Sequence, residues 1–497
     1  MNILFAQEHF TGGGSERHIE TLSKQLHEWG HSCVFCFGRG YAPETEPPFM
    51  RDGFPVYKDF FMPVGFQASF GQITQDIERL LAIIEEHEID AISFHYGCCI
   101  SFMIAAQLAQ VPFFLTVHGD NALNVAETPI DTALLYQGLN SATTDVFLVS
   151  EAARAVVDRL TNKPAVMLRN PVCVDAKRRA LSDGKSWAMV SMIREDTFPG
   201  MCSFFDWMPD LDIDRVYVYG SAPEGQNIWE EKLVSYVAEK GLSDRVIFKG
   251  YVFDWKNELP DECIGVVGAG RVVQEALVSG IPVIQLSISG YPCGLIDRSF
   301  YENAKNWNFS GRYLPSLQSA EELNDEISRL RSDAGNYLMV DAALRDFGVE
   351  GVANRFIETL SKASFRPYQG FLTYYSRILD IEDDWRAFSF DQGLDVFQSV
   401  FGCGSLISPS VLPLNRMASR VLMEIDGAQQ RLNGRVDNVQ ALLADISARV
   451  DDSERRVESV SQRLEEIEGS KTYKFSLILY NLLDKVGVTK LARSGRR

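Results

Sequence analysis

The chain opens with MNILFAQEHFTGGGSERHIETLSKQLHEWGHSCVFCF, residues 1–37, and this stretch decides the fold. Its residues 2–6 are a short apolar run, which predicts a buried strand. A second apolar run covers residues 32–37. A strand, a helix and a strand in this order indicate one βαβ unit of a parallel sheet. The helix is predicted from apolar residues that recur at helical spacing, at Ile19, Leu22, Leu26 and Trp29.

The same alternation continues to about residue 364 and predicts an α/β fold with two Rossmann-like, doubly wound domains. Near-continuous apolar runs separated by amphipathic helices are typical of parallel sheets covered by helices on both faces. Residues 162–186 contain turn-forming Asn-Pro and Asp-Gly pairs and predict the linker. We therefore expect an N-terminal domain over 1–175 and a C-terminal domain over 176–364. The apolar runs are too numerous for one domain and lie at 2–6, 32–37, 91–94, 113–118, 146–149, 188–191, 215–219, 245–248, 263–267 and 282–286.

The C-terminal part of the chain differs in composition. Residues 365–415 predict a connector or a small packed extension. Residues 416–468 predict a coiled coil, because apolar residues recur there at alternating spacings of four and three, and such a sustained repeat gives a left-handed supercoil. We expect a homo-oligomer through 432–467, and the valines and isoleucines of the second seam position favour three or more strands. The alternative is one long helix that packs on the body of the protein.

Residues 469–497 are a basic segment in an otherwise acidic chain. Their lysines and arginines alternate with apolar and aromatic side chains, as in helices that lie on an anionic membrane surface. Residues 470–497 therefore predict contact with a membrane. A helix that packs within the oligomer and carries a basic end is the alternative.

Composition narrows the classes of partner and compartment. The net charge of −19 argues against nucleic acid, because most of the surface would repel a phosphate backbone. Cys33 and Cys36 fall in an apolar run, and the nine cysteines show no regular framework, so we expect buried free thiols and a reducing compartment. The N-terminus lacks the basic and apolar regions of a signal peptide, and no run reaches the roughly 20 apolar residues of a membrane span. The expected location is the cytoplasm, either free or peripheral on the inner face of the cell membrane.

Three glycines, Gly12, Gly13 and Gly14, stand between the first strand and the first helix. Glycines at this point let backbone N–H groups approach an anion at the N-terminus of the helix. The spacing is not that of the dinucleotide fingerprint GxGxxG. The triplet by itself leaves a ligand-binding loop and a simple tight turn open.

Five segments, in order, resemble family-4-type retaining glycosyltransferases. The first runs from Gly12 to Glu16 and is followed by a helix and the pair Gly30-His31, as in the family's GG-x-E and GH opening. The last, QEALVSGIPVI at 274–284, is close to the family's E-A-x-x-x-G-x-P-V-I element. The resemblance covers residues 1–364, and its specificity comes from the order of the five elements. The three between them resemble an apolar strand ending in His-Gly at 114–119, a strand ending in Ser-Glu at 149–154 and an Asn-Pro turn at 169–172.

The resemblance implies a GT-B fold, in which a nucleotide-sugar donor binds between an N-terminal, acceptor-side domain and a C-terminal, donor-side domain. It implies that Glu275, at the N-terminus of a helix, accepts hydrogen bonds from the ribose diol. Gly270 and Arg271 would neutralise the diphosphate, because backbone N–H groups and a guanidinium stabilise a departing phosphate. His118 would contact the donor sugar at the end of its strand. Gly12, Gly13 and Gly14 would face the same phosphates or the acceptor.

The chain departs from the family pattern at two places. Val267 stands where the family usually carries a second glutamate, eight residues before the position of Glu275. Of the basic residues usual in the first loop of the second domain, Arg194 alone remains near the expected place. In our interpretation Arg271 substitutes for them, since a guanidinium chelates phosphate through two nitrogens.

We therefore expect a glycosyltransferase of the retaining hexosyltransferase type. It would move a sugar from a nucleotide-sugar donor to a glycan or lipid-linked acceptor in surface polysaccharide or glycoconjugate assembly. No metal and no other cofactor is expected. The alternative is a catalytically inactive GT-B-like scaffold whose coiled coil drives assembly. A GT-B phosphorylase or sugar-nucleotide epimerase is a third hypothesis, but neither the lysine motif of a pyridoxal enzyme nor the acid pairs of an epimerase are present.

Overall fold

The computed structural model describes residues 1–10, 13–41, 53–62, 70–95, 99–119, 138–161, 163–173, 182–222, 227–252, 254–287, 290–312 and 314–379. The predicted coiled coil at 416–468 and the basic tail at 469–497 lie outside these residues, as does most of the predicted connector at 365–415. These three assignments stay predictions.

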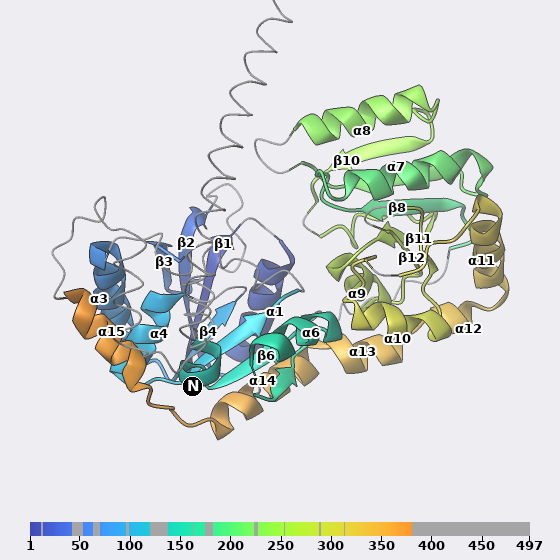
Figure 1. The fold of residues 1–497 in the computed structure, drawn as a ribbon. Coiled ribbons are helices and arrows are strands. Elements are labelled where there is room, and N and C mark those ends of the chain that lie inside the picture. The colour runs from blue at the N-terminus through green and yellow to red at the C-terminus, as the bar shows by residue number, and fades with distance from the viewer. Residues whose placement is uncertain are drawn as a thin grey trace, which may run out of the picture. The chain divides into compact units, whose positions relative to one another are not determined.

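The first sheet has seven strands among the described residues, in the order β3-β2-β1-β4-β5-β6-β7, and all its pairs are parallel. The order reverses between β1 and β4, so loops that leave the carboxyl ends of these two strands diverge there and leave room for a ligand. Its strands are β1 (Asn2–Phe10), β2 (Ser32–Tyr41), β3 (Val56–Phe60), β4 (Ala91–His95), β5 (Phe113–Val117), β6 (Asp145–Leu148) and β7 (Ala165–Met167). Its helices are α1 (Gly14–Glu28), α3 (Phe70–Glu86), α4 (Ile100–Ala109) and α6 (Glu151–Leu160), with a short π-helix η2 (Gly138–Ala142) (Figure 1).

The second sheet has six strands in the order β10-β9-β8-β11-β12-β13, and only the β12–β13 pair of the described strands is antiparallel. The predicted α/β class with two Rossmann-like sheets is therefore confirmed. The strands are β8 (Ser186–Val190), β9 (Arg215–Tyr219), β10 (Val246–Gly250), β11 (Cys263–Gly268), β12 (Val283–Gln285) and β13 (Gly294–Leu295). The helices are α7 (Phe198–Trp207), η3 (Met208–Asp210), α8 (Ile228–Glu239), α9 (Arg271–Val278), α10 (Arg298–Asn306), α11 (Ala320–Ser332), α12 (Ala334–Tyr337) and α13 (Val340–Phe347).

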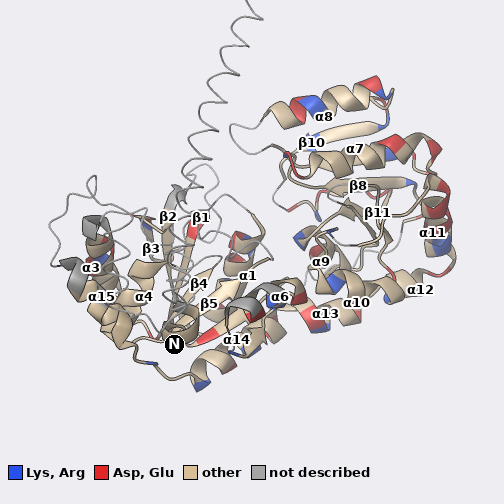
Figure 2. Ribbon diagram, viewed as in Figure 1, with Lys and Arg blue, Asp and Glu red and all other residues tan. Residues whose placement is uncertain are grey.

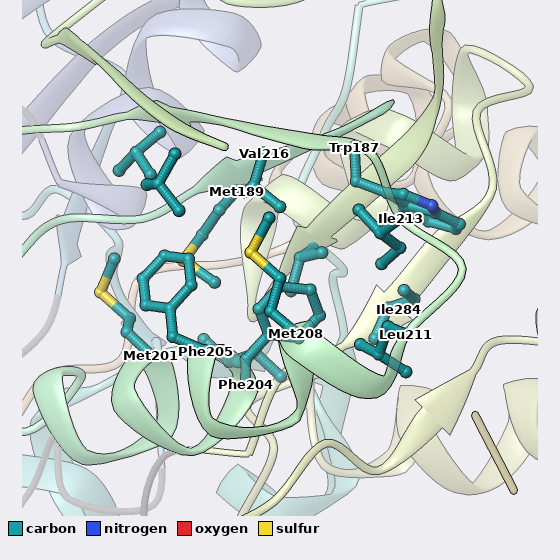
Figure 3. Close-up of a cluster of buried hydrophobic side chains, with 14 of the residues drawn as sticks. Trp187, Met189, Met201, Phe204, Phe205, Met208, Leu211, Ile213, Val216 and Ile284 are labelled. Atoms are coloured by element: carbon teal, nitrogen blue, oxygen red, sulfur yellow. The ribbon is translucent and has the colours of Figure 1, made fainter. Parts of the chain in front are cut away.

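The core of the second sheet shows why its strands read as continuous apolar runs. Trp187 and Met189 of β8 are fully buried, and Phe204 and Phe205 of α7 belong to the same core cluster between this helix and the sheet (Figure 3). A strand covered on both faces buries every side chain, so its sequence lacks the alternation of a half-exposed strand. Charged residues lie instead on outer helices such as α8 and α11 (Figure 2).

The two edge strands of the first sheet, β3 and β7, are not among the apolar runs named from the sequence, and neither is the two-residue β13 at an edge of the second sheet. The side chains of β7 are all half-buried, and those of β3 are mostly so. An edge strand with one covered face does not form a continuous apolar run. Because β7 lies within 162–186, the first sheet extends into the segment that was predicted as a linker.

The last described helices, α14 (Val349–Lys362) and α15 (Gln369–Leu379), return to the first sheet. The ring of Phe356 lies 5.9 Å from that of Phe5 and 5.3 Å from that of Phe147. Helix α15 lies beside α3 and α4 (Figure 1). The first core therefore contains residues from the end of the predicted second domain, 176–364.

Two further features of the described residues bear on the expectations. No described helix is long and apolar enough to cross a membrane. The described cysteines are all free, and all but Cys173 are buried, as predicted for Cys33 and Cys36. Burial raises the pKa of the Cys33 thiol to about 12, so this thiol stays protonated and unreactive at neutral pH.

Candidate active site

Three histidines meet at the carboxyl edge of the first sheet. His95 ends β4, His118 directly follows the neighbouring strand β5, and His18 lies on α1. Nδ1 of His95 lies 2.9 Å from Nε2 of His118, and the ring centroids of His18 and His118 are 4.9 Å apart. The parallel pairing of β4 and β5 brings the first two together, because the carboxyl ends of parallel strands share one edge. We call these three residues the histidine cluster.

Burial keeps the histidine cluster neutral. It lowers the pKa of His18 to about 3, and the positive charge of Arg271 adds to this effect. Burial also holds the pKa values of His95 and His118 well below the ordinary value. Repulsion from a proton on a neighbouring ring lowers both pKa values further. At neutral pH each ring therefore carries one N–H donor and one acceptor nitrogen.

Arg271, the first residue of α9, contacts three separate segments. Its Nε donates to Glu275 Oε1 at 2.9 Å, and its Nη2 donates to Thr21 Oγ1 at 3.0 Å and to the Pro171 carbonyl oxygen at 2.8 Å. Nη1 is buried and has no hydrogen-bond partner among the described residues. A buried guanidinium N–H without an acceptor is costly, so this atom fits an anionic ligand.

Glu275 faces Arg271 from one turn further along α9. The prediction that it stands at the N-terminus of the helix was wrong by one turn, because α9 begins at Arg271. Its Oε2 accepts a hydrogen bond from Trp255 Nε1 at 3.2 Å, and Trp255 is buried. Arg271 and Glu275, predicted to contact the phosphates and the ribose, are thus direct neighbours. Phosphate and ribose are also neighbours in a nucleotide.

Gly270 precedes α9 with φ at 66°, a conformation that favours glycine. Its N–H donates to the Phe309 carbonyl oxygen at 2.5 Å. Because this amide is already paired, it would have to give up that bond to contact a phosphate. The geometry therefore favours Arg271 over the Gly270 amide as the phosphate-binding group.

The glycines before α1 have an acidic neighbour. Gly13 precedes the helix without a side-chain cap, and Gly14 is its first residue; Gly12 lies outside the described residues. A Cβ on Gly13 would lie 2.8 Å from Glu16 Oε2. The Glu16 carboxylate therefore occupies the space beside the N-terminus of α1, where it repels a phosphate.

The structure does not bring Arg194 and Val267 into this group of residues. Arg194 lies in the loop after β8, where its Nε pairs with Asp196 Oδ1 at 2.7 Å. Within the described ranges no contact joins it to Arg271 or Glu275. Val267, at the position of the family's missing glutamate, is fully buried in the apolar core of the second sheet.

Sequence reasoning missed most of the partners that hold the site together. His18 Nδ1 lies 3.1 Å from Asn170 Oδ1, and Asn308 Oδ1 accepts from Asn170 Nδ2 at 3.3 Å and from Gln274 Nε2 at 2.8 Å. A signal for His95 was present, because it ends a strand next to the one that precedes His118. Nothing in the spacing pointed to Asn308, which lies far away in sequence. Within the described part of the chain no group of three or more histidine, cysteine or acidic side chains is arranged to hold a metal ion.

Residues 12–176 match the family model Glycosyltransferase Family 4. No curated protein matches the chain in sequence. The Anabaena protein HepE, solved in complex with UDP and glucose, is 16% identical with a TM-score of 0.52, over 73% of this chain and 100% of that one. A glycosyltransferase from Rickettsia africae is 15% identical with a TM-score of 0.54, over 77% and 99%. Sucrose-phosphate synthase from Thermosynechococcus elongatus is also 15% identical, with a TM-score of 0.53, over 73% and 98%.

The two parallel sheets and these structural likenesses define the GT-B fold. With residues 12–176 matching Glycosyltransferase Family 4, the chain is a glycosyltransferase. The expected class of enzyme is thereby confirmed.

Proposed function

We propose that this glycosyltransferase transfers a hexose, with retention at the anomeric carbon, from a nucleotide-sugar donor bound at Arg271 and Glu275. The observation that carries the proposal is the buried Nη1 of Arg271, which has no acceptor among the described residues while its other nitrogens are held in place. A fixed cation of this kind stabilises the charge that develops on a departing diphosphate without reorganising. The acceptor in this proposal is a glycan or a lipid-linked sugar.

Glu275 is proposed to bind the ribose diol of the donor. Its two carboxylate oxygens are held by Arg271 and Trp255, so the side chain is oriented before the ligand arrives. Each carboxylate oxygen has a further lone pair, so it can still accept a hydrogen bond from a ribose hydroxyl. His118 is proposed to contact the donor sugar, because Arg271 is close enough for its charge to lower the pKa of His118.

Gly13 and Gly14 are proposed to face the acceptor rather than the phosphates. The Glu16 carboxylate beside Gly13 would repel a diphosphate, whereas it accepts hydrogen bonds from sugar hydroxyls readily. Of the two roles left open by the resemblance, this acidic neighbour favours the second.

A thermal-shift screen with UDP, GDP, CDP and ADP tests the donor site. HepE was solved with UDP, so we expect UDP to give the largest shift. Saturation at a hundred times the dissociation constant adds about 2.7 kcal/mol of stability. In Glu275→Ala the shift should be lost, while Glu239→Ala, an exposed acid on α8, should keep it.

An inactive scaffold is the second candidate, and the burial of Val267 in place of a family glutamate favours it. No shift with any of the four nucleotides would support the scaffold and contradict the donor site. An equal shift in Glu275→Ala would contradict the ribose assignment alone.

We also propose that residues 432–467 form an oligomeric coiled coil and that 470–497 bind an anionic membrane, from the heptad pattern and the basic apolar tail. Deletion of 470–497 should abolish sedimentation with anionic vesicles. It should leave the oligomeric state, measured by analytical ultracentrifugation, unchanged. Vesicle binding that survives the deletion would show that the tail is not the membrane contact.

A further inference from the structure

A chain of hydrogen bonds runs from the interior of the first sheet to its carboxyl edge. Ser93 Oγ lies 3.1 Å from His95 Nε2, and His95 Nδ1 lies 2.9 Å from His118 Nε2. Ser93 and His95 are two residues apart on β4, so their side chains share one face of the sheet. Both are fully buried, whereas His118 is partly exposed.

Two directions of donation are possible along this chain, because each neutral imidazole carries a single N–H. Either Ser93 donates to His95 and His95 donates to His118, or both bonds are reversed. The first direction leaves the N–H of His118 on Nδ1. The second leaves Nδ1 as an acceptor.

The surroundings of Ser93 decide between the two directions. Among the described residues, His95 is the single hydrogen-bond partner of the Ser93 hydroxyl. If Ser93 accepted from His95, its own hydroxyl hydrogen would be buried without an acceptor, which is strongly unfavourable. If Ser93 donates, that hydrogen is paired and only a second lone pair is left unfilled.

Neutral rings make the direction persistent. A protonated His95 would donate from both nitrogens and erase the preference, but burial and the two neighbouring histidines hold its pKa well below the ordinary value. Arg271 acts in the same sense on His118. No carboxylate hydrogen-bonds any ring of the histidine cluster among the described residues, so nothing there draws in a second proton.

We propose that Ser93 and His95 are positioning residues that hold His118 as the Nδ1–H tautomer, so that His118 donates a hydrogen bond in the active site. The group it meets on the substrate is then an acceptor oxygen, such as a sugar hydroxyl oxygen. The role in catalysis rests on the proposed function, whereas the tautomer is a property of the protein alone.

The first test is the ¹⁵N spectrum of the histidine side chains in the full, substrate-free chain at pH 7.5, with His118 assigned from His118→Gln. We expect a protonated Nδ1 and an unprotonated Nε2 on His118. The opposite pattern would overturn the proposal without reference to any ligand.

Ser93→Ala tests the source of the preference. It removes the donor to His95 Nε2 without adding volume, so the Nε2–H form of His118 should become populated. Thr116→Val is the matched control, because Thr116 faces His95 across the β4–β5 pair and its buried hydroxyl has no hydrogen-bond partner among the described residues. This control should leave the His118 spectrum unchanged. An unchanged spectrum in Ser93→Ala would refute the role of Ser93.

Activity separates a positioning role from a merely structural one. His95→Leu should lower kcat/KM about tenfold, the loss of one hydrogen bond to the reacting sugar, and His95→Gln should restore most of it because its amide N–H donates to His118 Nε2. Equal activity in Leu and Gln variants that fold would contradict the proposal. If none of the four nucleotides gives a thermal shift while the Nδ1–H tautomer is observed, the proposed function fails and this inference stands.

Discussion

Arg271 combines a structural and a chemical role in one side chain. Two of its nitrogens hold Glu275, Thr21 and the Pro171 carbonyl, and this arrangement aims the third nitrogen in a fixed direction. A lysine keeps the charge but has a single nitrogen on a flexible stem, so it cannot make these contacts together. Orientation of the cation, more than its charge, is what the guanidinium contributes.

Arg271→Lys should therefore weaken binding of a nucleoside diphosphate about tenfold and leave binding of the nucleoside alone unchanged. Titration calorimetry with UDP and uridine measures both. Arg298→Lys, at an exposed position on α10, is the control and should change neither. Equal UDP affinity in the Arg271 variant would show that this residue does not bind the diphosphate.

The sequence indicated the residues that lie near the carboxyl ends of strands, but it did not indicate their partners. His118 and Arg271 lie in segments whose pattern indicates such a position, whereas Glu275 lies one turn further into its helix than predicted. Ser93 reaches that site only through His95, because β4 pairs with β5, and the order of strands in a sheet cannot be derived from local spacing. Arg194 was predicted from a loop position, and its pairing with Asp196 depends on a loop conformation that no periodicity specifies.

At the scale of elements, α14 is the piece that completes the first core. Its buried face contributes Val352, Ala353, Phe356 and Leu360 to the cluster around β1 and β6. The helical spacing of these apolar residues does not indicate which sheet the helix covers, because an apolar stripe fits any apolar surface. The central strands could be predicted, because a strand that helices cover on both faces has a near-continuous apolar sequence.

Phe356→Ala should destabilise the first domain by about 3–5 kcal/mol, because it leaves a cavity between Phe5 and Phe147. Asn354→Ala, on the exposed face of the same helix, should cost less than about 0.5 kcal/mol. Urea unfolding followed by fluorescence gives both values. A small effect of Phe356→Ala would mean that α14 is dispensable for the first core.

At the scale of the whole molecule, the histidine cluster couples folding to pH. In the unfolded chain these histidines bind protons below a pKa of about 6.5, whereas in the folded chain they stay neutral. The unfolded state therefore binds more protons on acidification, so stability is lost as the pH falls below that value and is fully present above it. The loss continues for His18 down to its folded pKa of about 3.

Each buried histidine contributes up to about 1.4 kcal/mol per pH unit, so the cluster should cost up to about 4 kcal/mol between pH 7.5 and pH 5.5. The urea midpoint at the two pH values measures this. His18→Asn should reduce the difference, and His27→Asn, exposed on the same helix, should not. A midpoint that does not move between the two pH values would contradict the burial of neutral rings.

The return of α14 and α15 to the first sheet also sets an order of events during synthesis. The second sheet and its helices are built from one continuous stretch, β8 to α13, whereas the first core needs residues on both sides of that stretch. A ribosome releases the N-terminal strands first, yet Phe356 is translated after the whole second sheet. The domain that is made first is therefore finished last, and its exposed apolar strands must wait for α14 while the second domain folds.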